Sequence, residues 1–302
     1  MPTVGAALAD AEERLAAAGV ETPRVDAEWL LAGILEVGRN ALAVNVMRPL
    51  PEMTAARYAD VVKRRTRREP LQRILGWEEF RGLRLRLTND VLVPRPETEA
   101  LVEWALGALP APSAGARPLV VDVGTGSGCI ACAIAHARLD VEVVAVDISG
   151  AAVEVARANV EALGLERRVH VVATDLTSAL GEASADLIVA NLPYLPDAWL
   201  DALAPEVRAH DPRLALAGGA DGLDVVRRLL PDARRVLRPG GVLLLETAGD
   251  TLSPAAIGTL QASATATLLS AAGFVGVTAR ADLAGVTRFI AGRTPAGAGH
   301  TP

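Results

Sequence analysis

The stretch Val120–Gly128 (VVDVGTGSG) decides the fold, because an apolar run ends there in a glycine-rich turn and a helical segment follows. Glycines at a strand-to-helix turn let a ligand approach the backbone N–H groups at the helix N-terminus. A glycine-rich turn by itself also occurs in dinucleotide dehydrogenases and in plain tight turns. The segments around it must therefore identify the ligand.

Apolar strand-like runs alternate with helical segments on the C-terminal side of this turn. The runs are LVVDV (119–123), VEVVAVD (141–147), VHVVATD (169–175), ADLIVAN (185–191) and GGVLLLE (240–246). Such alternation indicates an α/β fold with a doubly wound, Rossmann-like sheet. Two closing strands, FVGVTARADL and VTRFIAGR, are close enough in sequence to pair antiparallel, so we expect a mostly parallel sheet with an antiparallel last strand.

Four segments are expected along the 302 residues. Residues 1–75 show helical periodicity interrupted by prolines and predict a small helical bundle, whereas residues 76–95 change to a period of two and predict a β-hairpin connector. Residues 96–293 form the large α/β domain, and residues 294–302 are predicted to be a disordered tail. The basic run 63–68 ends a predicted helix, where a solvated terminus is the simplest interpretation.

Composition narrows the class of protein. A net charge of −6 argues against nucleic-acid binding driven by bulk electrostatics. No apolar run of about 20 residues and no basic leader is present, so we expect a cytoplasmic protein that does not enter the membrane. Cys129 and Cys132 have C-x-x-C spacing, but further ligands at zinc spacing are absent; small core residues and no metal site are expected.

Three strand ends favour S-adenosylmethionine over a nicotinamide cofactor. The loop reads G-x-G-x-G rather than G-x-G-x-x-G, and S-adenosylmethionine has no pyrophosphate to hold. Asp147 ends the next strand, where a carboxylate can accept hydrogen bonds from both ribose hydroxyls. Asp175 and Leu176 follow the third strand and can bracket an adenine. The predicted cofactor contacts are Gly124, Thr125, Gly126, Ser127, Gly128, Asp147, Asp175 and Leu176.

The tetrapeptide Asn191-Leu192-Pro193-Tyr194 follows the fourth strand and predicts the acceptor of the methyl group. An amide-like nitrogen is a poor nucleophile because its lone pair is delocalised, so a site that methylates it must hold both N–H groups. The Asn191 side-chain oxygen and the Leu192 carbonyl can each accept one of them. Pro193 would fix the turn, and the Tyr194 ring would pack against the planar group. An ordinary Asn-Pro-type turn is the alternative.

With these segments in hand, the sequence resembles the bacterial HemK-type methyltransferases that modify a glutamine of peptide chain release factors. The resemblance includes the segment Val93–Glu99 (VPRPETE), similar to that family's PRPETE hallmark, and Asp221–Asp224 (DGLD). It implies a class I methyltransferase fold in which Asn191 also contacts the cofactor and residues 191–194 hold the glutamine of a Gly-Gly-Gln loop. It further implies that the N-terminal bundle grips the release factor, and we expect a monomer.

Leu192 and Leu176 depart from the family pattern. The tetrapeptide usually has proline where Leu192 stands, and an aromatic residue is frequent at the position of Leu176. Because residue 192 contributes its backbone carbonyl, leucine keeps the acceptor, and activity is expected to be retained. Two alternatives stay open: an amino methyltransferase acting on adenine or guanine of RNA or DNA, and a non-catalytic protein that keeps only the cofactor fold.

Overall fold

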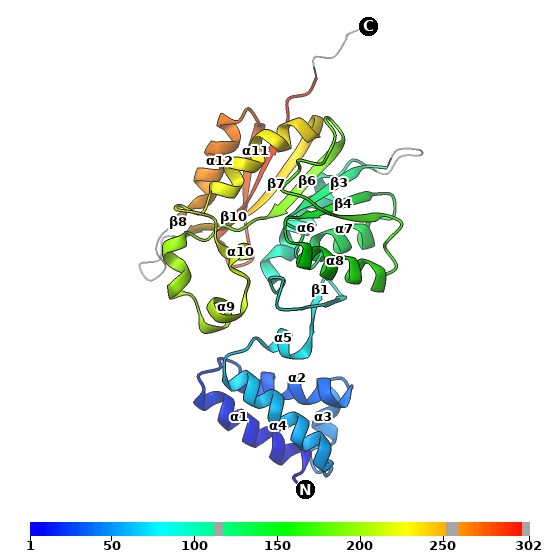
Figure 1. Ribbon diagram of the computed structural model, residues 1–302, viewed down its shortest axis with the longest axis vertical. Coiled ribbons are helices and arrows are strands. Elements are labelled where there is room, and N and C mark those ends of the chain that lie inside the picture. Colours follow the sequence, from blue (N-terminus) through cyan, green and yellow to red (C-terminus); the bar gives the residue numbers. More distant parts are fainter. Residues whose placement is uncertain (112–116, 252–258, 298–302) are drawn as a thin grey trace. The chain divides into compact units, whose positions relative to one another are not determined.

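The computed structural model describes residues 1–111, 117–251 and 259–297, and the chain divides into two compact units (Figure 1). The first unit comprises Met1–Glu78 together with Leu203–His210, and the second comprises Glu79–Ala202 and Asp211–Pro302. The segment 203–210 was not expected in the N-terminal unit. In the described part of the chain, no helix is both long and apolar enough to cross a membrane.

The first unit is a bundle of helices around an aliphatic core. Its helices are α1 (Val4–Ala17), α2 (Pro23–Leu35), α3 (Asn40–Val44), α4 (Glu52–Thr66), α5 (Leu71–Leu75) and α9 (Pro205–His210). Helix α1 buries Val4, Leu8, Ala11 and Leu15, which recur every three or four residues and therefore share one face. The Tyr58 hydroxyl donates a hydrogen bond to the Ala27 carbonyl (2.9 Å) and ties α4 to α2.

Arginines of the basic run bind α9 inside this unit. The Arg65 side chain is buried; its Nε donates to Asp26 Oδ2 (2.7 Å) and its Nη1 to Glu206 Oε1 (3.1 Å). Arg68 Nε also donates to Glu206 Oε1 (2.6 Å). The expectation of a solvated helix terminus is therefore wrong for Arg65, because two carboxylates compensate the cost of burying its charge.

Strands β1 (Trp77–Phe80) and β2 (Leu83–Arg86) form a separate two-stranded sheet. Leu83 and Leu85 are buried whereas Arg84 and Arg86 are exposed, as the period of two predicts. The division between the two units falls within β1. The strands lie in the segment where the hairpin was expected.

The second unit is built on one large sheet, in the order β5-β4-β3-β6-β7-β10-β9, with β8 paired to β7. Its strands are β3 (Leu119–Val123), β4 (Glu142–Asp147), β5 (Val169–Ala173), β6 (Ala185–Asn191), β7 (Leu237–Thr251), β8 (Thr259–Leu260), β9 (Val275–Ala281) and β10 (Thr287–Arg293). Strands β3 to β7 pair in parallel, and β10 runs antiparallel to both β7 and β9. The predicted fold class is confirmed.

Helices cover both faces of this sheet, as the near-continuous apolar runs of its central strands require (Figure 1). Helices α6 (Pro96–Ala108), α7 (Cys129–Ala137) and α8 (Gly150–Ala162) pack on one face, and α11 (Asp224–Val236) and α12 (Gln261–Ala271) pack on the other. A 3₁₀ helix (Asp197–Ala202) and the short α10 (Arg213–Leu216) lie in the connection between β6 and α11. The strand order reverses between β3 and β6, which places a crevice at their carboxyl ends.

The predicted disordered tail, residues 294–302, is held at its start. Thr294 Oγ1 donates to the Arg238 carbonyl (2.6 Å), and Gly240 N donates to the Pro295 carbonyl (3.3 Å). Thr294 and Pro295, the two residues after β10, are thus hydrogen-bonded to β7. The predicted start of the disordered tail at residue 294 is therefore wrong. Residues 298–302 lie outside the described residues.

Candidate functional site

The glycine loop joins β3 to α7 and is held by hydrogen bonds to Asp122 of β3. This buried carboxylate accepts hydrogen bonds from Thr125 Oγ1 (2.6 Å) and Ala131 N (3.1 Å). Burial raises the pKa of Asp122 to about 7, although both hydrogen bonds oppose the rise. Gly126 has φ +54°, and a Cβ built on it would meet no atom within 4 Å. The backbone at Gly126 is therefore open to a ligand.

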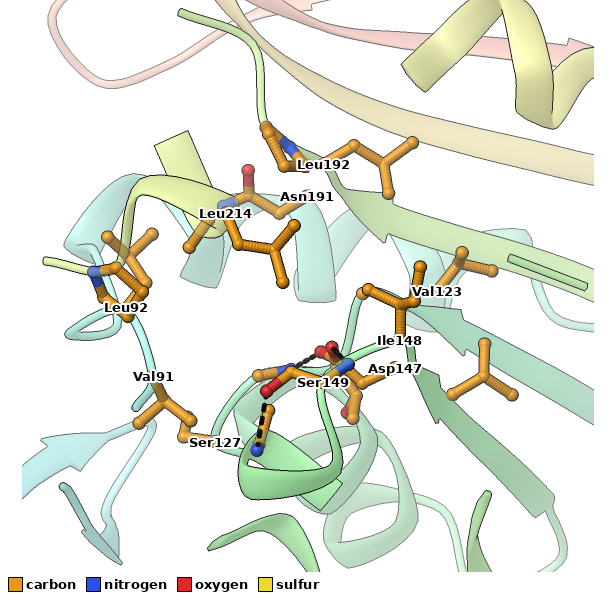
Figure 2. A pocket seen from close by; sticks show the side chains of 18 of the residues that line it. Val91, Leu92, Val123, Ser127, Asp147, Ile148, Ser149, Asn191, Leu192 and Leu214 are labelled. Carbon is orange, nitrogen blue, oxygen red and sulfur yellow. Dashed lines mark hydrogen bonds between the residues drawn. The ribbon is translucent and has the colours of Figure 1, made fainter. Parts of the chain in front are cut away.

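Asp147, at the end of β4, links the glycine loop to the start of α8. Its Oδ2 accepts a hydrogen bond from Gly126 N and its Oδ1 accepts one from Ser149 N, both at 2.9 Å (Figure 2). Each carboxylate oxygen has two lone pairs, so both keep the capacity to accept a further hydrogen bond. The sequence predicted that Asp147 would bind the ribose, but it did not predict the contact of Asp147 with the loop.

Asp175 and Leu176 follow β5 at the outer side of the same crevice. Asp175 forms an ion pair with Arg228 of α11. Leu176 has φ +50°, a left-handed conformation that is uncommon for a residue other than glycine. This left-handed residue fixes the turn of the chain after β5, and with it the positions from which the two side chains leave the backbone. Arg228 was not predicted as a site residue, because nothing in the sequence links α11 to β5.

The tetrapeptide 191–194 begins at the last residue of β6. Asn191 Nδ2 donates a hydrogen bond to Thr98 Oγ1 of α6 (3.1 Å). Leu192 is buried in the core formed with α11 and α12. Burial is also the main reason that the pKa of Tyr194 rises to about 12, so its phenol stays neutral.

The backbone after the tetrapeptide is held by Gln261 and Gly222. Gln261 Nε2 donates to the Tyr194 carbonyl (2.6 Å) and to the Asp221 carbonyl (3.1 Å), while its Oε1 accepts from Ala248 N (3.1 Å). A Cβ on Gly222 would lie 2.2 Å from the Tyr194 carbonyl oxygen, which leaves room only for glycine. The DGLD segment therefore has a steric role at the site.

These elements surround one cavity of about 220 Å³ in the second unit (Figure 2). Of the predicted site residues, the cavity is lined by Gly124–Ser127, Asp147, Asp175, Leu176 and Asn191–Pro193. Gly128 and Tyr194 do not line it: Gly128 is the N-cap of α7 with φ +82°, and Tyr194 follows the last lining residue of the tetrapeptide, Pro193. Figure 2 shows Asp147 and Asn191 on different strand ends of the same cavity.

Two further segments line the cavity and are not among the predicted site residues. One runs from Asp90 to Thr98, and the other runs from Pro212 to Ala217. Arg95 Nη2 pairs with Asp211 Oδ2 (2.9 Å), whose side chain is only 2% exposed, so one segment anchors the other. The PRPETE-like stretch was the signal for the first segment.

The two cysteines are free thiols at the start of α7. Burial raises the pKa of both Cys129 and Cys132. A thiol with a raised pKa is a weak nucleophile at neutral pH. Their C-x-x-C spacing thus reflects small residues packed in the core.

Comparisons with known proteins agree with this geometry. The PrmC N-terminal domain model matches residues 6–76, and the methyltransferase small domain model matches residues 105–202. The chain is 42% identical to the release factor glutamine methyltransferase of Geobacter sulfurreducens over 279 residues, which cover 92% of each chain. It is 40% identical to the protein of that name from Mycobacterium tuberculosis, over 95% of this chain and 90% of that one.

Solved structures show the same fold at low sequence identity. The hMettl16 catalytic domain, in complex with MAT2A 3′UTR hairpin 1, matches with a TM-score of 0.54 at 16% identity, covering 81% of this chain and 84% of that chain. Such a likeness carries the architecture only. The matches to curated relatives, about 40% identical over more than 90% of this chain, decide the family. This chain belongs to the release factor glutamine methyltransferases, which are S-adenosylmethionine-dependent enzymes.

Proposed function

We propose that this chain transfers a methyl group from S-adenosylmethionine to the side-chain amide nitrogen of the glutamine in the Gly-Gly-Gln loop of peptide chain release factors. The observation that carries the proposal is that Asn191 and Leu192 line the same cavity as the glycine loop and Asp147. An acceptor for amide N–H groups and a cradle for the methyl donor are thereby combined. The names of the relatives support the choice of substrate.

The cavity has the features that S-adenosylmethionine needs. Gly126 leaves its backbone open, Asp147 can accept hydrogen bonds from the ribose hydroxyls, and Asp175 and Leu176 can bracket the adenine. When bound, the cofactor supplies an electrophilic methyl group on a sulfonium centre. The protein contributes orientation, because a sulfonium leaving group makes in-line transfer mainly a matter of placing the nucleophile.

Asn191 and Leu192 are proposed to hold the amide of the substrate. The Asn191 Oδ1 and the Leu192 carbonyl would each accept one N–H, which keeps the nitrogen lone pair directed into the cavity and stabilises the positive charge that develops on the nitrogen. Pro193 would restrict the turn that follows them. Tyr194 does not line the cavity in this structure, so its proposed role is to pack behind the turn rather than against the planar amide of the substrate.

The first unit is proposed to recognise the release factor. The enzyme is proposed to act in the cytoplasm as a monomer.

A nucleic-acid substrate fits the charge of the protein less well. The net charge is −6, and Arg64, Arg65 and Arg68 of the basic run are engaged in ion pairs with Glu69, Asp26 and Glu206. Those guanidinium groups are therefore not free to neutralise phosphates.

A labelling experiment tests the proposal. The protein is incubated with methyl-labelled S-adenosylmethionine and, separately, a release factor, the same factor with alanine in place of the loop glutamine, and RNA. Label is expected on the first substrate alone, and mass spectrometry should place it on the glutamine side chain. Label on the alanine variant or on RNA would refute the proposed substrate.

Replacing Leu192 with proline, the residue usual at this position, is expected to leave transfer nearly intact. The backbone carbonyl acceptor remains, so we expect less than a tenfold change in rate, or about 1.4 kcal/mol. Removing the buried leucine side chain should lower the free energy of unfolding by about 1.5–3 kcal/mol. Single-turnover rates and thermal denaturation of L192P against wild type measure the two effects, and a rate loss beyond a hundredfold would contradict the backbone role.

A further inference from the structure

Glu246 is a buried carboxyl group directly beside the site. It lies on β7, where its Cα pairs with that of Asn191 on the parallel neighbour β6, so the two side chains leave the same face of the sheet. Glu246 is only 3% exposed and does not line the cavity, although Asn191 and Thr98 both do. Its Oε2 has no hydrogen-bond partner among the described residues. A buried carboxyl with an unpaired oxygen is costly and needs a reason.

The surroundings of Glu246 favour a carboxyl group that ionises near neutral pH. Burial is the largest effect and raises its pKa to about 7; the Thr98 hydroxyl, the charge of Arg288 and the Asn191 amide oppose that rise, and the charge of Glu97 adds to it. The titratable and charged groups that interact with it come from three elements or their ends: Glu97 of α6, Tyr194 after β6 and Arg288 of β10. Arg288 is itself bound to Asp282 through Nε (2.7 Å).

The hydrogen bonds of Asn191 show why a carboxylate belongs at this position. The two ends of an asparagine amide have nearly the same shape, so only their partners decide which end faces which way. Asn191 turns its NH₂ end toward Thr98 of α6. An ionised carboxyl can only accept hydrogen bonds, so Glu246 beside this end excludes the reversed orientation, in which oxygen would meet oxygen.

We propose that Glu246 is a positioning residue: as a carboxylate it holds the NH₂ end of Asn191 and so leaves Asn191 Oδ1 available to the amide of the substrate. This inference rests on the proposed transfer to an amide nitrogen. The ion–dipole contact also polarises the Asn191 amide, which makes Oδ1 a better acceptor for an N–H whose nitrogen becomes positive. Glu246 itself does not touch the substrate.

Ionisation of Glu246 then controls the rate. When Glu246 is protonated it can donate to Oδ1, and the two orientations of Asn191 become comparable. The rate constant for transfer should therefore rise with pH through the pKa of Glu246 near 7. Stability should change in the opposite sense: a carboxyl whose pKa is higher in the folded state than in the unfolded state lowers the free energy of unfolding as pH rises between these two values.

The rate constant and the free energy of unfolding are expected to change with pH in opposite directions, and this difference distinguishes a positioning role of Glu246 from a structural one. Glu246→Gln removes the charge but keeps the shape, so at pH 8 we expect about a tenfold to hundredfold lower rate constant. Cofactor affinity should stay within about twofold, and the melting temperature should be equal or higher because a buried charge is gone. The rate increase near pH 7 should disappear in E246Q. The matched control is Glu103→Gln, since Glu103 is 71% exposed on α6 and pairs only with Arg81 in the described structure.

The experiment measures single-turnover transfer to release factor from pH 6 to 9, cofactor affinity by calorimetry, and thermal unfolding, for wild type, E246Q, E103Q and Glu246→Asp. The aspartate variant keeps the charge and should restore the pH dependence even if its rate is reduced. An E246Q variant with wild-type rates and an unchanged pH profile would overturn the inference. So would parallel losses of melting temperature, cofactor affinity and rate. Absence of label from the wild type would instead refute the proposed function.

Discussion

Replacing Asn191 with alanine is expected to lower the rate constant of methyl transfer by about 10²–10³-fold, the usual effect of removing one preorganised polar group that stabilises transition-state charge. In the proposed mechanism Asn191 Oδ1 accepts one N–H of the substrate amide, and alanine offers no replacement. Without it, the nitrogen lone pair stays conjugated with the carbonyl and is poorly directed. Single-turnover transfer at saturating cofactor measures the loss.

Cofactor binding provides the internal control for N191A. The glycine loop, Asp147 and Asp175 follow β3, β4 and β5, and the Asn191 side chain donates its hydrogen bond to Thr98 of α6 rather than to any of them. We expect the dissociation constant for S-adenosylmethionine, measured by calorimetry, to change by less than about fivefold, or about 1 kcal/mol. Undiminished transfer in N191A would remove Asn191 from the mechanism.

Replacing Asp147 with alanine is expected to weaken cofactor binding by about a hundredfold. The variant loses the proposed acceptor for the ribose hydroxyls and also leaves the N–H groups of Gly126 and Ser149 without their partner, so the glycine loop loses its anchor. Hydrogen bonds to a charged group contribute about 1.5–3 kcal/mol each, which makes a hundredfold loss a modest expectation. Calorimetric titration with S-adenosylmethionine measures it.

The matched comparison for D147A is Asp175→Ala. Asp175 is about half-exposed and paired with Arg228, so solvent screens its charge and a loss below tenfold is expected. Transfer by D147A should recover substantially when cofactor is raised above its new dissociation constant, because Asn191 and Leu192 are unchanged. Equal effects of the two substitutions would show that Asp147 has no special place in binding.

The sequence predicted those parts of the site that are formed by residues consecutive in the chain. A strand that runs into a glycine turn, as at Val120–Gly128, specifies its own local geometry, and the ends of parallel strands converge at one edge of the sheet. Asp147 and Asn191 could therefore be placed from their positions at strand ends alone. The antiparallel pairing of β9 and β10 followed from the short connection between them.

The parts that sequence reasoning missed depend on contacts between distant segments. Thr98 meets Asn191 across 93 positions, and Gln261 meets the Tyr194 carbonyl across 67. Glu246 ends the apolar run GGVLLLE, where it looks like an ordinary polar residue at a strand terminus. Only the register of β7 against β6 reveals that its neighbour is Asn191. Such pairings come from packing, and no local pattern encodes them.

The assignment of Leu203–His210 to the N-terminal unit has a consequence for how this enzyme can diverge. The chain passes between the units after Glu78, Ala202 and His210, so a gene fragment that begins at Glu79 would encode α9 without the arginines that bind Glu206. An exchange of N-terminal helices between relatives must bring a compatible α9 with it. The two stretches of gene are therefore expected to coevolve, although more than a hundred codons separate them.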